Sequence, residues 1–249
     1  MPRTKKFTRE QLEPCLLPDI PRGDPIPPIV WRELFGNDHG VEVEIGFGKG
    51  LFLTTSAAAN PEINYCGVEI ERKYQLYAAT RLIERGITNV CLACGDGREI
   101  LRDRIAPRSV EVLHVYFPDP WWKTKHRKRR VFTPEFVRAA GNVLKCGGRL
   151  SIATDVEAYH GVMTRIVYGM GPAFRELPPP LPSEGKDESD YLTSFERKFR
   201  MEGRPIYRAA FERTEASFPD TLPQDPGLTR PFKEFDKYNS SPPPEDSST

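Results

Sequence analysis

Short apolar runs alternate with segments of helical periodicity through most of this chain, and that alternation restricts its fold more than any other feature. Runs typical of strands lie at 41–47, 64–70, 89–94, 111–117 and 149–155. Segments of helical period lie at 51–60, 73–85, 134–144 and 157–169. Such alternation is typical of βα units, in which helices cover both faces of a parallel sheet. The sequence therefore predicts an α/β fold with a doubly wound, mostly parallel sheet.

The two ends of the chain differ in composition from this central part. Residues 1–40 contain seven prolines, which disfavour long helices and predict an irregular arm, with one short amphipathic piece at 31–35 that docks it on the core. A helix at 193–201 and a closing strand at 205–213 complete the central part. We therefore expect an N-terminal arm (1–40), one domain (41–214) and a C-terminal tail (215–249), whose last residues, about ten, are disordered.

Composition excludes several classes of protein. No apolar run approaches the roughly 18 residues that a membrane helix needs, and the N-terminus lacks the apolar core of a secretory signal. Five cysteines, an odd count in a chain of 249 residues, indicate reduced thiols and a cytoplasmic protein. Cys91 and Cys94 form a C-x-x-C pair, but residues i and i+3 of a strand point to opposite faces. No second pair accompanies them, so no metal is expected.

A glycine-rich turn follows the first predicted strand. Gly46, Gly48 and Gly50 lie in the sequence EIGFGKG, before the helix at 51–60. Glycines at such a turn allow the backbone to approach a ligand closely. The spacing is G-x-G-x-G rather than the G-x-G-x-x-G of dinucleotide sites, and Glu44 lies just upstream. A carboxylate here repels a pyrophosphate and attracts a cation, which argues against a nicotinamide cofactor.

Two further acids follow the next two predicted strands. Glu69 ends the second strand, where doubly wound folds place an acid that binds ribose hydroxyls, and Asp96 follows the third. Together with Glu44 they suit a ligand with a ribose, an exocyclic amine and a positive charge, and S-adenosyl-L-methionine has all three. The alternative is ordinary turn chemistry, because Gly and Asp are common turn residues. We expect cofactor contacts from these three acids and from Gly46 and Gly48.

The fourth predicted strand leads into the most specific stretch of the chain, VYFPDPWWKTKHRKRR (115–130). Pro118 and Pro120 stiffen a turn that carries Asp119 toward the sheet edge where the other acids lie, and such positioning matters for group transfer. Six basic residues follow: Lys123, Lys125, Arg127, Lys128, Arg129 and Arg130. In a chain of net charge +1 this run predicts contacts with a nucleic-acid backbone, the alternative being a solvated charged loop.

In this order, the motifs resemble those of the bacterial tRNA (guanine-N7-)-methyltransferase family. The matching residues are E-I-G-F-G (44–48), G-V-E (67–69), F-P-D-P-W-x-K-x-x-H-x-K-R-R (117–130), A-T-D (153–155) and T-x-F-E (193–196). The resemblance covers about two thirds of the chain, and the F-P-D-P-W block is its most specific part. It implies a class I, Rossmann-like enzyme that uses S-adenosyl-L-methionine to methylate N7 of a guanosine in the variable loop of tRNA (position 46).

The resemblance also implies roles for individual residues. Glu44, Glu69, Asp96 and Asp119 would contact the cofactor, with Asp119 also at the catalytic centre. Contacts with the substrate would come from Lys123, Asp155, Thr193, Ser194, Phe195 and Glu196. Either Asp155 or Glu196 fits as the carboxylate that binds the guanine edge. Thr193 and Glu196 also fit a helix start with a capping box.

Guanine N7 has a free lone pair, so its methylation needs no base to remove a proton. The product ring is cationic, and nearby carboxylates stabilise it, Asp119 and Asp155 being the candidates. Two alternatives stay open: a methyltransferase for another RNA, and a non-catalytic RNA-binding module on the same fold, which the set of acids disfavours. The sequence leaves open whether the chain is a monomer or a homodimer and whether it needs a separate protein partner.

Overall fold

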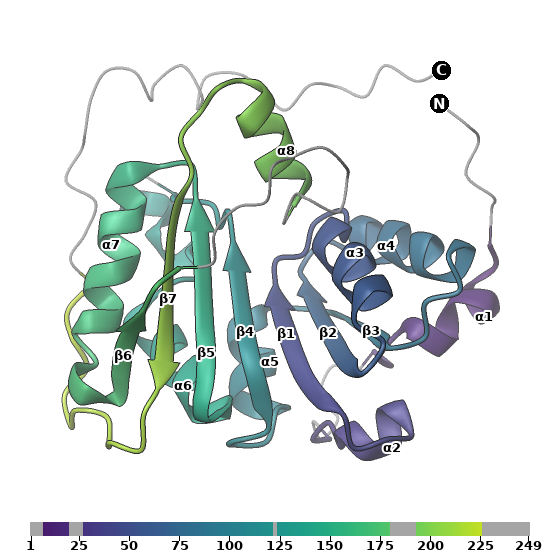
Figure 1. Ribbon diagram of the computed structural model, residues 1–249, viewed down its shortest axis with the longest axis horizontal. Coiled ribbons are helices and arrows are strands. Elements are labelled where there is room, and N and C mark those ends of the chain that lie inside the picture. The colour runs from purple at the N-terminus through teal and green to yellow at the C-terminus, as the bar shows by residue number, and fades with distance from the viewer. Residues whose placement is uncertain (1–6, 20–26, 122–123, 180–192, 226–249) are drawn as a thin grey trace.

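A computed structural model describes residues 7–19, 27–121, 124–179 and 193–225. In these residues the chain forms a seven-stranded sheet with the order β3-β2-β1-β4-β5-β7-β6 (Figure 1). The strands are β1 (Gly40–Ile45), β2 (Ile63–Glu69), β3 (Val90–Cys94), β4 (Val110–Tyr116), β5 (Leu144–Thr154), β6 (Phe174–Leu177) and β7 (Tyr207–Arg213). Strand β7 pairs antiparallel with both β5 and β6, whereas β1 to β5 pair in parallel. The predicted doubly wound, mostly parallel sheet is confirmed.

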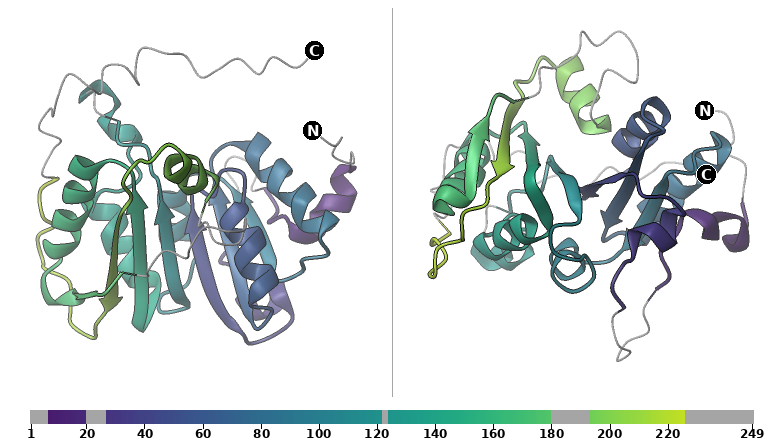
Figure 2. Two further views of the ribbon diagram at one scale, coloured as in Figure 1. Left: turned by 45° about the horizontal axis from the view of Figure 1, so that its top comes forward. Right: turned by 60° about the horizontal axis from the view of Figure 1, so that its bottom comes forward.

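Helices cover both faces of this sheet (Figure 2). They are α1 (Arg9–Leu12), η1 (Glu13–Cys15), α2 (Trp31–Phe35), α3 (Leu51–Ala59), α4 (Arg72–Glu84), α5 (Gly97–Asp103), η2 (Thr124–Arg129), α6 (Pro134–Val143), α7 (Glu157–Tyr168), η3 (Gly171–Ala173) and α8 (Ser194–Met201). One buried apolar cluster joins the sheet to α5, α6 and α7, and a second joins it to α1, α3 and α4. The sequence analysis did not anticipate α5 and β6, which are short.

Strand β1 shows how the sequence divides between the two faces. Its apolar residues Val41, Val43 and Ile45 alternate with Glu42 and Glu44, and the apolar set belongs to the cluster under α5 and α6. Because successive side chains of a strand point to opposite faces, the two glutamates lie on the face that α3 covers. The two-residue period of the strand therefore directs the side chains of Glu42 and Glu44 toward a covered face of the sheet.

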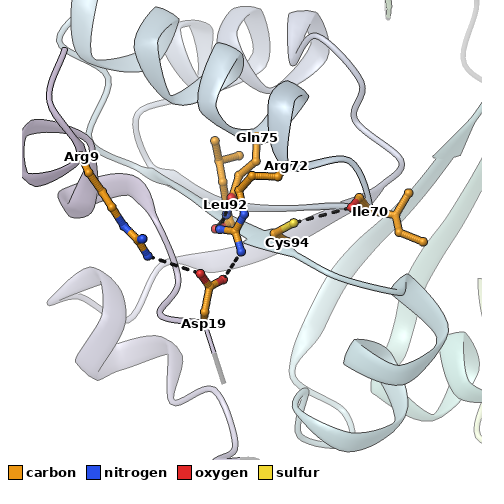
Figure 3. Close-up of polar contacts among 7 residues, drawn as sticks. All are labelled: Arg9, Asp19, Ile70, Arg72, Gln75, Leu92 and Cys94. Carbon is orange, nitrogen blue, oxygen red and sulfur yellow. Dashed lines mark hydrogen bonds and ion pairs between the residues drawn. The ribbon is translucent and has the colours of Figure 1, made fainter. Parts of the chain in front are cut away.

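The N-terminal arm is bound to the edge strand β3 and to α4. The backbone N–H of Leu17 donates to the carbonyl of Leu92 (2.9 Å). Asp19 accepts from Arg9 (3.3 Å) and from Arg72 at the start of α4 (2.5 Å), as Figure 3 shows. Arg72 also donates to Gln75, whose amide donates to the same carbonyl of Leu92 (both 2.9 Å). The arm thus supports the strand that leads to Asp96.

Part of the predicted C-terminal tail packs on the body. Arg213 at the end of β7 donates to the carbonyls of Gly141 (2.9 Å) and Ala216 (2.8 Å). Phe218 lies against this guanidinium, 4.4 Å from its central carbon, and contacts Phe174. The remainder of the tail, from residue 226, lies outside the described residues. Residues 180–192, between β6 and α8, also lie outside them.

All five cysteines are free thiols, as expected. Burial raises the pKa of Cys15 to about 11 and that of Cys66 to about 12. Because the thiolate is the reactive form, these buried side chains are inert packing residues. No helix within the described ranges is long and apolar enough to cross a membrane.

Gly67 in β2 and Gly161 in α7 provide a matched test of the packing. A Cβ on Gly67 would lie 2.6 Å from the Phe47 ring and 3.0 Å from Leu92, and it would also clash with Leu53. We expect Gly67→Ala to lower the free energy of unfolding by about 1–3 kcal/mol through overpacking. A Cβ on Gly161 meets nothing within 4 Å, so Gly161→Ala should raise it by about 0.5–1 kcal/mol through helix propensity. Urea unfolding of both variants measures the difference, and equal values would contradict this packing.

Candidate functional site

The glycine-rich turn between β1 and α3 leaves open space at the carboxyl end of the sheet. Gly46, Gly48 and Gly50 all have positive φ (79°, 52° and 69°), a conformation that favours glycine. A Cβ on Gly46 would meet nothing within 4 Å, and one on Gly48 would meet only the Phe195 ring, at 4.0 Å. In contrast, a Cβ on Gly50 would lie 2.7 Å from Ala78. The first two glycines therefore border room for a ligand, while the third permits α3 to pack on α4.

Glu69, at the end of β2, holds this turn in place. Its side chain is only 8% exposed, and one carboxylate oxygen accepts from the backbone N–H of Gly48 (2.9 Å). The other oxygen accepts from the N–H of Glu71 (3.0 Å). Each carboxylate oxygen has a second lone pair, so the group can accept further hydrogen bonds from hydroxyls of a ligand.

Glu44 lies beneath the turn and is 1% exposed. Burial raises its pKa well above the ordinary value, and the charge of Glu69 raises it further. Among the described residues, none forms a hydrogen bond with its Oε2 atom. A buried carboxylate oxygen without a partner is costly and rare in folded proteins. This arrangement favours a cationic or hydrogen-bond-donating ligand at the open space above the turn.

Asp96 follows β3 next to Glu69, whose carbonyl accepts from the N–H of Gly95 (3.0 Å). Its carboxylate caps α5 by accepting from the N–H of Arg98 (2.9 Å), and it also binds the Arg98 guanidinium, with contacts down to 2.5 Å. This arginine lowers the pKa of Asp96. Arg98 also donates to the carbonyl of Lys128 (3.0 Å), so it ties the β3 end to η2. Arg98 was not predicted as a site residue from the sequence, because no sequence pattern marks an arginine that connects the end of β3 to η2.

Asp119 sits in a turn with an unusual backbone. Phe117 and Trp121, two large residues on either side of the Pro-Asp-Pro sequence, have φ values of 52° and 44°. Bulky residues rarely adopt this left-handed conformation, and such strain tends to occur at functional sites. The N–H of Phe117 donates to the carbonyl of Ala153 in β5 (2.8 Å), which fixes the start of the turn. Asp119 itself is exposed, while the protein around its carboxyl raises its pKa by desolvation.

Helix α8 lies above the carboxyl end of the sheet and covers part of the site (Figure 1). Its Phe195 side chain is 52% exposed and stacks on Phe199, and both rings contact Phe117 of the Asp119 turn. Since the Phe195 ring also faces Gly48, it joins the glycine turn to the Asp119 turn. Thr193 caps the helix by accepting from the N–H of Glu196 (3.0 Å), which confirms the expected helix start. Ser194 is exposed beside it.

The two carboxylates expected at the guanine edge are engaged by arginines. Glu196 is 1% exposed and binds Arg208 (2.5 Å) and Arg200 (3.6 Å). Asp155, just after β5, binds Arg204. Desolvation raises the pKa of Asp155, although Arg204 opposes this effect. Both acids therefore hold the α8 segment against the sheet, and these ion pairs occupy part of the acceptor capacity of each carboxylate.

The basic run does not behave as one surface. Within η2, which lies at the same edge of the sheet (Figure 2), Lys128 and Arg129 are exposed, and Arg129 lies over the Trp121 ring at 5.0 Å. Arg130 is 2% exposed, and its Nε atom donates to the carbonyl of Pro120 (2.7 Å). The expectation that Arg130 contacts an RNA backbone is thus corrected, because a buried side chain does not reach a phosphate. Lys123 lies outside the described residues, as do the side chains of Lys125 and Arg127.

The chain is similar in sequence to known methyltransferases. A family described as "Putative methyltransferase" matches residues 38–209. A curated tRNA (guanine-N(7)-)-methyltransferase from Rhodopirellula baltica is 41% identical over 190 residues, which are 73% of this chain and 69% of the relative. One of the same name from Streptococcus sanguinis is 35% identical over 187 residues, 73% of this chain and 86% of the relative.

Among solved structures, the aminoglycoside resistance methyltransferase NpmB1 superposes with a TM-score of 0.53 at 16% identity, covering 75% of this chain and 94% of that one. At this identity the likeness concerns the fold, and it confirms the class I methyltransferase architecture. The curated relatives share sequence over most of their own length and over most of this chain. The chain belongs to the tRNA (guanine-N(7)-)-methyltransferase family.

Proposed function

We propose that this chain transfers a methyl group from S-adenosyl-L-methionine to N7 of a guanosine in the variable loop of tRNA. Its family supports the reaction and the substrate. The observation that carries the cofactor is the buried carboxylate of Glu44, with an oxygen to which no described residue donates, next to the open space over Gly46 and Gly48. Such a site suits a ligand that brings a positive charge and fills the gap.

Each acid has a distinct part in this proposal. Glu44 accepts from a cationic group of the cofactor, which relieves its desolvation. Glu69 accepts from ribose hydroxyls with the lone pairs that the Gly48 and Glu71 amides leave free. Asp96 lies beside it, held by Arg98, and faces the nucleoside end. The bare glycine backbone at 46 and 48 lets the cofactor lie close to the turn.

When bound, S-adenosyl-L-methionine supplies an electrophilic methyl carbon: the bond from carbon to guanine N7 forms, the bond to sulfur breaks, and sulfur keeps the electron pair. N7 carries a free lone pair, so the protein need not provide a base. Its task is to align the two reactants, and good alignment contributes about 7–11 kcal/mol in favourable systems. Asp119, in its strained turn, stabilises the positive charge that develops on the purine.

The tRNA is held from the rim of the site. We assign backbone contacts to the exposed Lys128 and Arg129 and, with them, to Lys123, Lys125 and Arg127 of the same run. Phe195, half exposed above the glycine turn, offers a face on which a base can stack. Asp155 or Glu196 then recognises the guanine edge with the acceptor capacity that its ion pair leaves free. We place the reaction in the cytoplasm, in keeping with its tRNA substrate and the free thiols.

The central test is a methylation assay. Purified protein is incubated with S-adenosyl-L-methionine and an unmodified tRNA transcript, and the digested nucleosides are examined by mass spectrometry. We expect 7-methylguanosine, and we expect Asp119→Asn to lower kcat about 100-fold or more. Desolvation raises the pKa of Asp119, and the carboxylate is the active form. The kcat of the wild type should therefore fall as the pH is lowered, with a midpoint above the ordinary pKa of 3.8.

The control for this assay is Asp38→Asn, which neutralises an exposed aspartate. Asp38 lies just before β1, at the amino ends of the parallel strands and so opposite the site. It should keep the wild-type kcat and pH profile. Normal turnover of Asp119→Asn would remove Asp119 from the catalytic centre. Methylation of ribosomal RNA but not of tRNA would replace the substrate while keeping the chemistry, and cofactor binding without any methylated product would favour the non-catalytic RNA-binding module.

Glu44 is expected to favour cofactor binding at the expense of stability. Folding raises its pKa, so the ionised side chain costs free energy at neutral pH, and stability rises as pH falls toward the ordinary value of 4.5. Glu44→Gln should therefore raise the free energy of unfolding of the cofactor-free protein by about 1 kcal/mol. It should also weaken cofactor binding, measured by calorimetry, whereas the exposed Glu62→Gln changes neither quantity. Undiminished affinity in Glu44→Gln would contradict the role given to this acid.

The exposed part of the basic run should set the salt dependence of tRNA binding. Each contact with a phosphate releases counterions, so Lys128→Gln and Arg129→Gln should each reduce the slope of log affinity against log salt by about 0.7–0.9. Lys145→Gln removes one cation from the opposite end of β5, where Lys145 pairs with Glu111. This control should leave the slope unchanged, and an unaltered slope in all three variants would mean that η2 is a solvated loop.

A further inference from the structure

The guanidinium of Arg130 binds the turn that carries Asp119. Its Nε atom donates to the carbonyl of Pro120 (2.7 Å) and one terminal nitrogen donates to the carbonyl of Trp121 (3.2 Å). The side chain is 2% exposed although it ends the most basic stretch of the chain. One planar cation thus joins two successive carbonyls directly after Asp119.

We propose that Arg130 is a positioning residue for methyl transfer, which fixes the backbone after Asp119 so that its carboxylate meets the reacting purine. This inference rests on the proposed function for its kinetic consequences. Arg130 is 2% exposed, so its proposed effect on the reaction passes through the turn that it binds and not through direct contact with cofactor or RNA.

The need for such a residue follows from the backbone. The φ and ψ angles of Trp121 set the orientation of the Pro120 carbonyl relative to its own, and its φ of 44° is unfavourable for a large side chain. Phe117 at the other end of the turn has a φ of 52°. Conformations of this kind are costly for large residues and persist only where surrounding contacts hold them. The start of the turn is held by the hydrogen bond from Phe117 to Ala153, and the end is held by Arg130.

The buried cation has a counter-charge from the C-terminal segment. Asp225 lies 3.6 Å from a terminal nitrogen of Arg130 and is 26% exposed at its side chain. This residue lies beyond the 38–209 match to the family. Burial raises the pKa of Tyr159 in α7, and the charges of Arg130, Asp119 and Asp225 also act on it, so these three groups surround one buried side chain. The tail segment therefore contributes to the setting of the catalytic turn.

An arginine is required by the geometry. Its rigid fork can donate to two carbonyls at once, whereas a lysine ammonium is a compact charge on a flexible stem and lacks that fork. Lys128, two positions earlier, has an exposed side chain, and its backbone carbonyl accepts a hydrogen bond from Arg98. Residues of the same charge in one short run thus have different tasks, and kinetics can separate them.

The experiment compares Arg130→Lys, Arg130→Gln and Asp225→Asn with the wild-type full-length chain. Four quantities are measured: kcat, KM for tRNA, the cofactor dissociation constant, and amide hydrogen exchange of residues 117–121, which report through the N–H groups of Phe117, Asp119 and Trp121. We expect both Arg130 variants to lose about 10–100-fold in kcat, as small misplacements of reacting groups do, while KM and cofactor affinity are retained. Exchange at 117–121 should become faster, and Asp225→Asn should show the same changes to a smaller extent.

Lys128→Gln is the matched control, since it removes one exposed cation from the same run. It should raise KM for tRNA, keep kcat, and leave exchange at 117–121 as in the wild type. A merely structural role of Arg130 would instead speed exchange throughout the protein and lower kcat only through loss of folded enzyme.

The outcomes distinguish this inference from the proposed function. If the wild type produces no 7-methylguanosine, the proposed function fails, while the exchange data still test Arg130: faster exchange confined to 117–121 in Arg130→Lys supports positioning. The inference is overturned if Arg130→Lys keeps wild-type kcat and exchange. It is also overturned if Arg130→Lys and Asp225→Asn both speed exchange uniformly along the chain. Asp225→Asn keeps the test informative should both Arg130 variants fold poorly.

Discussion

The parallel pairing of β1 with β2 on one side and with β4 on the other is the constraint on which the site depends. From β1 the chain first winds outward through β2 and β3, and it then returns to place β4 against the free side of β1. Ligands of doubly wound sheets bind at the carboxyl ends of the strands, where this direction reverses. The glycine turn and the Asp119 turn are therefore neighbours although more than sixty residues separate them in the chain. Helix α8 needs only to lie over both turns to complete the site.

Although the chain is nearly neutral, its candidate site has acidic residues that are buried and basic residues that are exposed. Glu44 and Glu69 are buried within the sheet, and burial raises the pKa of Glu44, so a cationic ligand would offset the cost of its charge. Lys128 and Arg129 lie at the rim, in solvent, where they attract a polyanion over a longer range. The ion pairs Asp155–Arg204 and Glu196–Arg208 connect the α8 segment to the strand ends. This layering fits a site for two substrates of opposite charge.

Much of this arrangement could be predicted from the sequence. The strand and helix periods of the central part, and the acids that follow consecutive strands, are local patterns, and the structure places Glu44, Glu69 and Asp96 together because parallel strands end at one edge. The short α5 and β6 were missed, since seven and four residues carry little periodicity. The partners of Asp155 and Glu196 were missed as well, because they come from Arg204 and Arg208, which follow α8 in the chain.

The basic run shows most clearly where the sequence stops being informative. The sequence does not distinguish the six basic residues at positions 123–130 from one another. In the structure, however, Arg130 is buried and Arg129 is exposed. The difference arises from the left-handed backbone at Trp121 and from carbonyls that need a donor. Neither feature has a signature in composition or spacing, so only a three-dimensional structure assigns the two arginines to different tasks.

The incomplete bonding of Glu44 also affects how the protein behaves as a folded molecule. A ligand that binds the native state alone stabilises it in proportion to the logarithm of its concentration, by about 2.7 kcal/mol at one hundred times its dissociation constant. In the binding mode proposed above, a cationic ligand would also offset the cost of ionising Glu44, whose pKa burial raises. The supply of cofactor therefore acts on the enzyme twice, once as the source of the group transferred and once as a structural component. Cells with little of it would hold not only a slower enzyme but a less durable one.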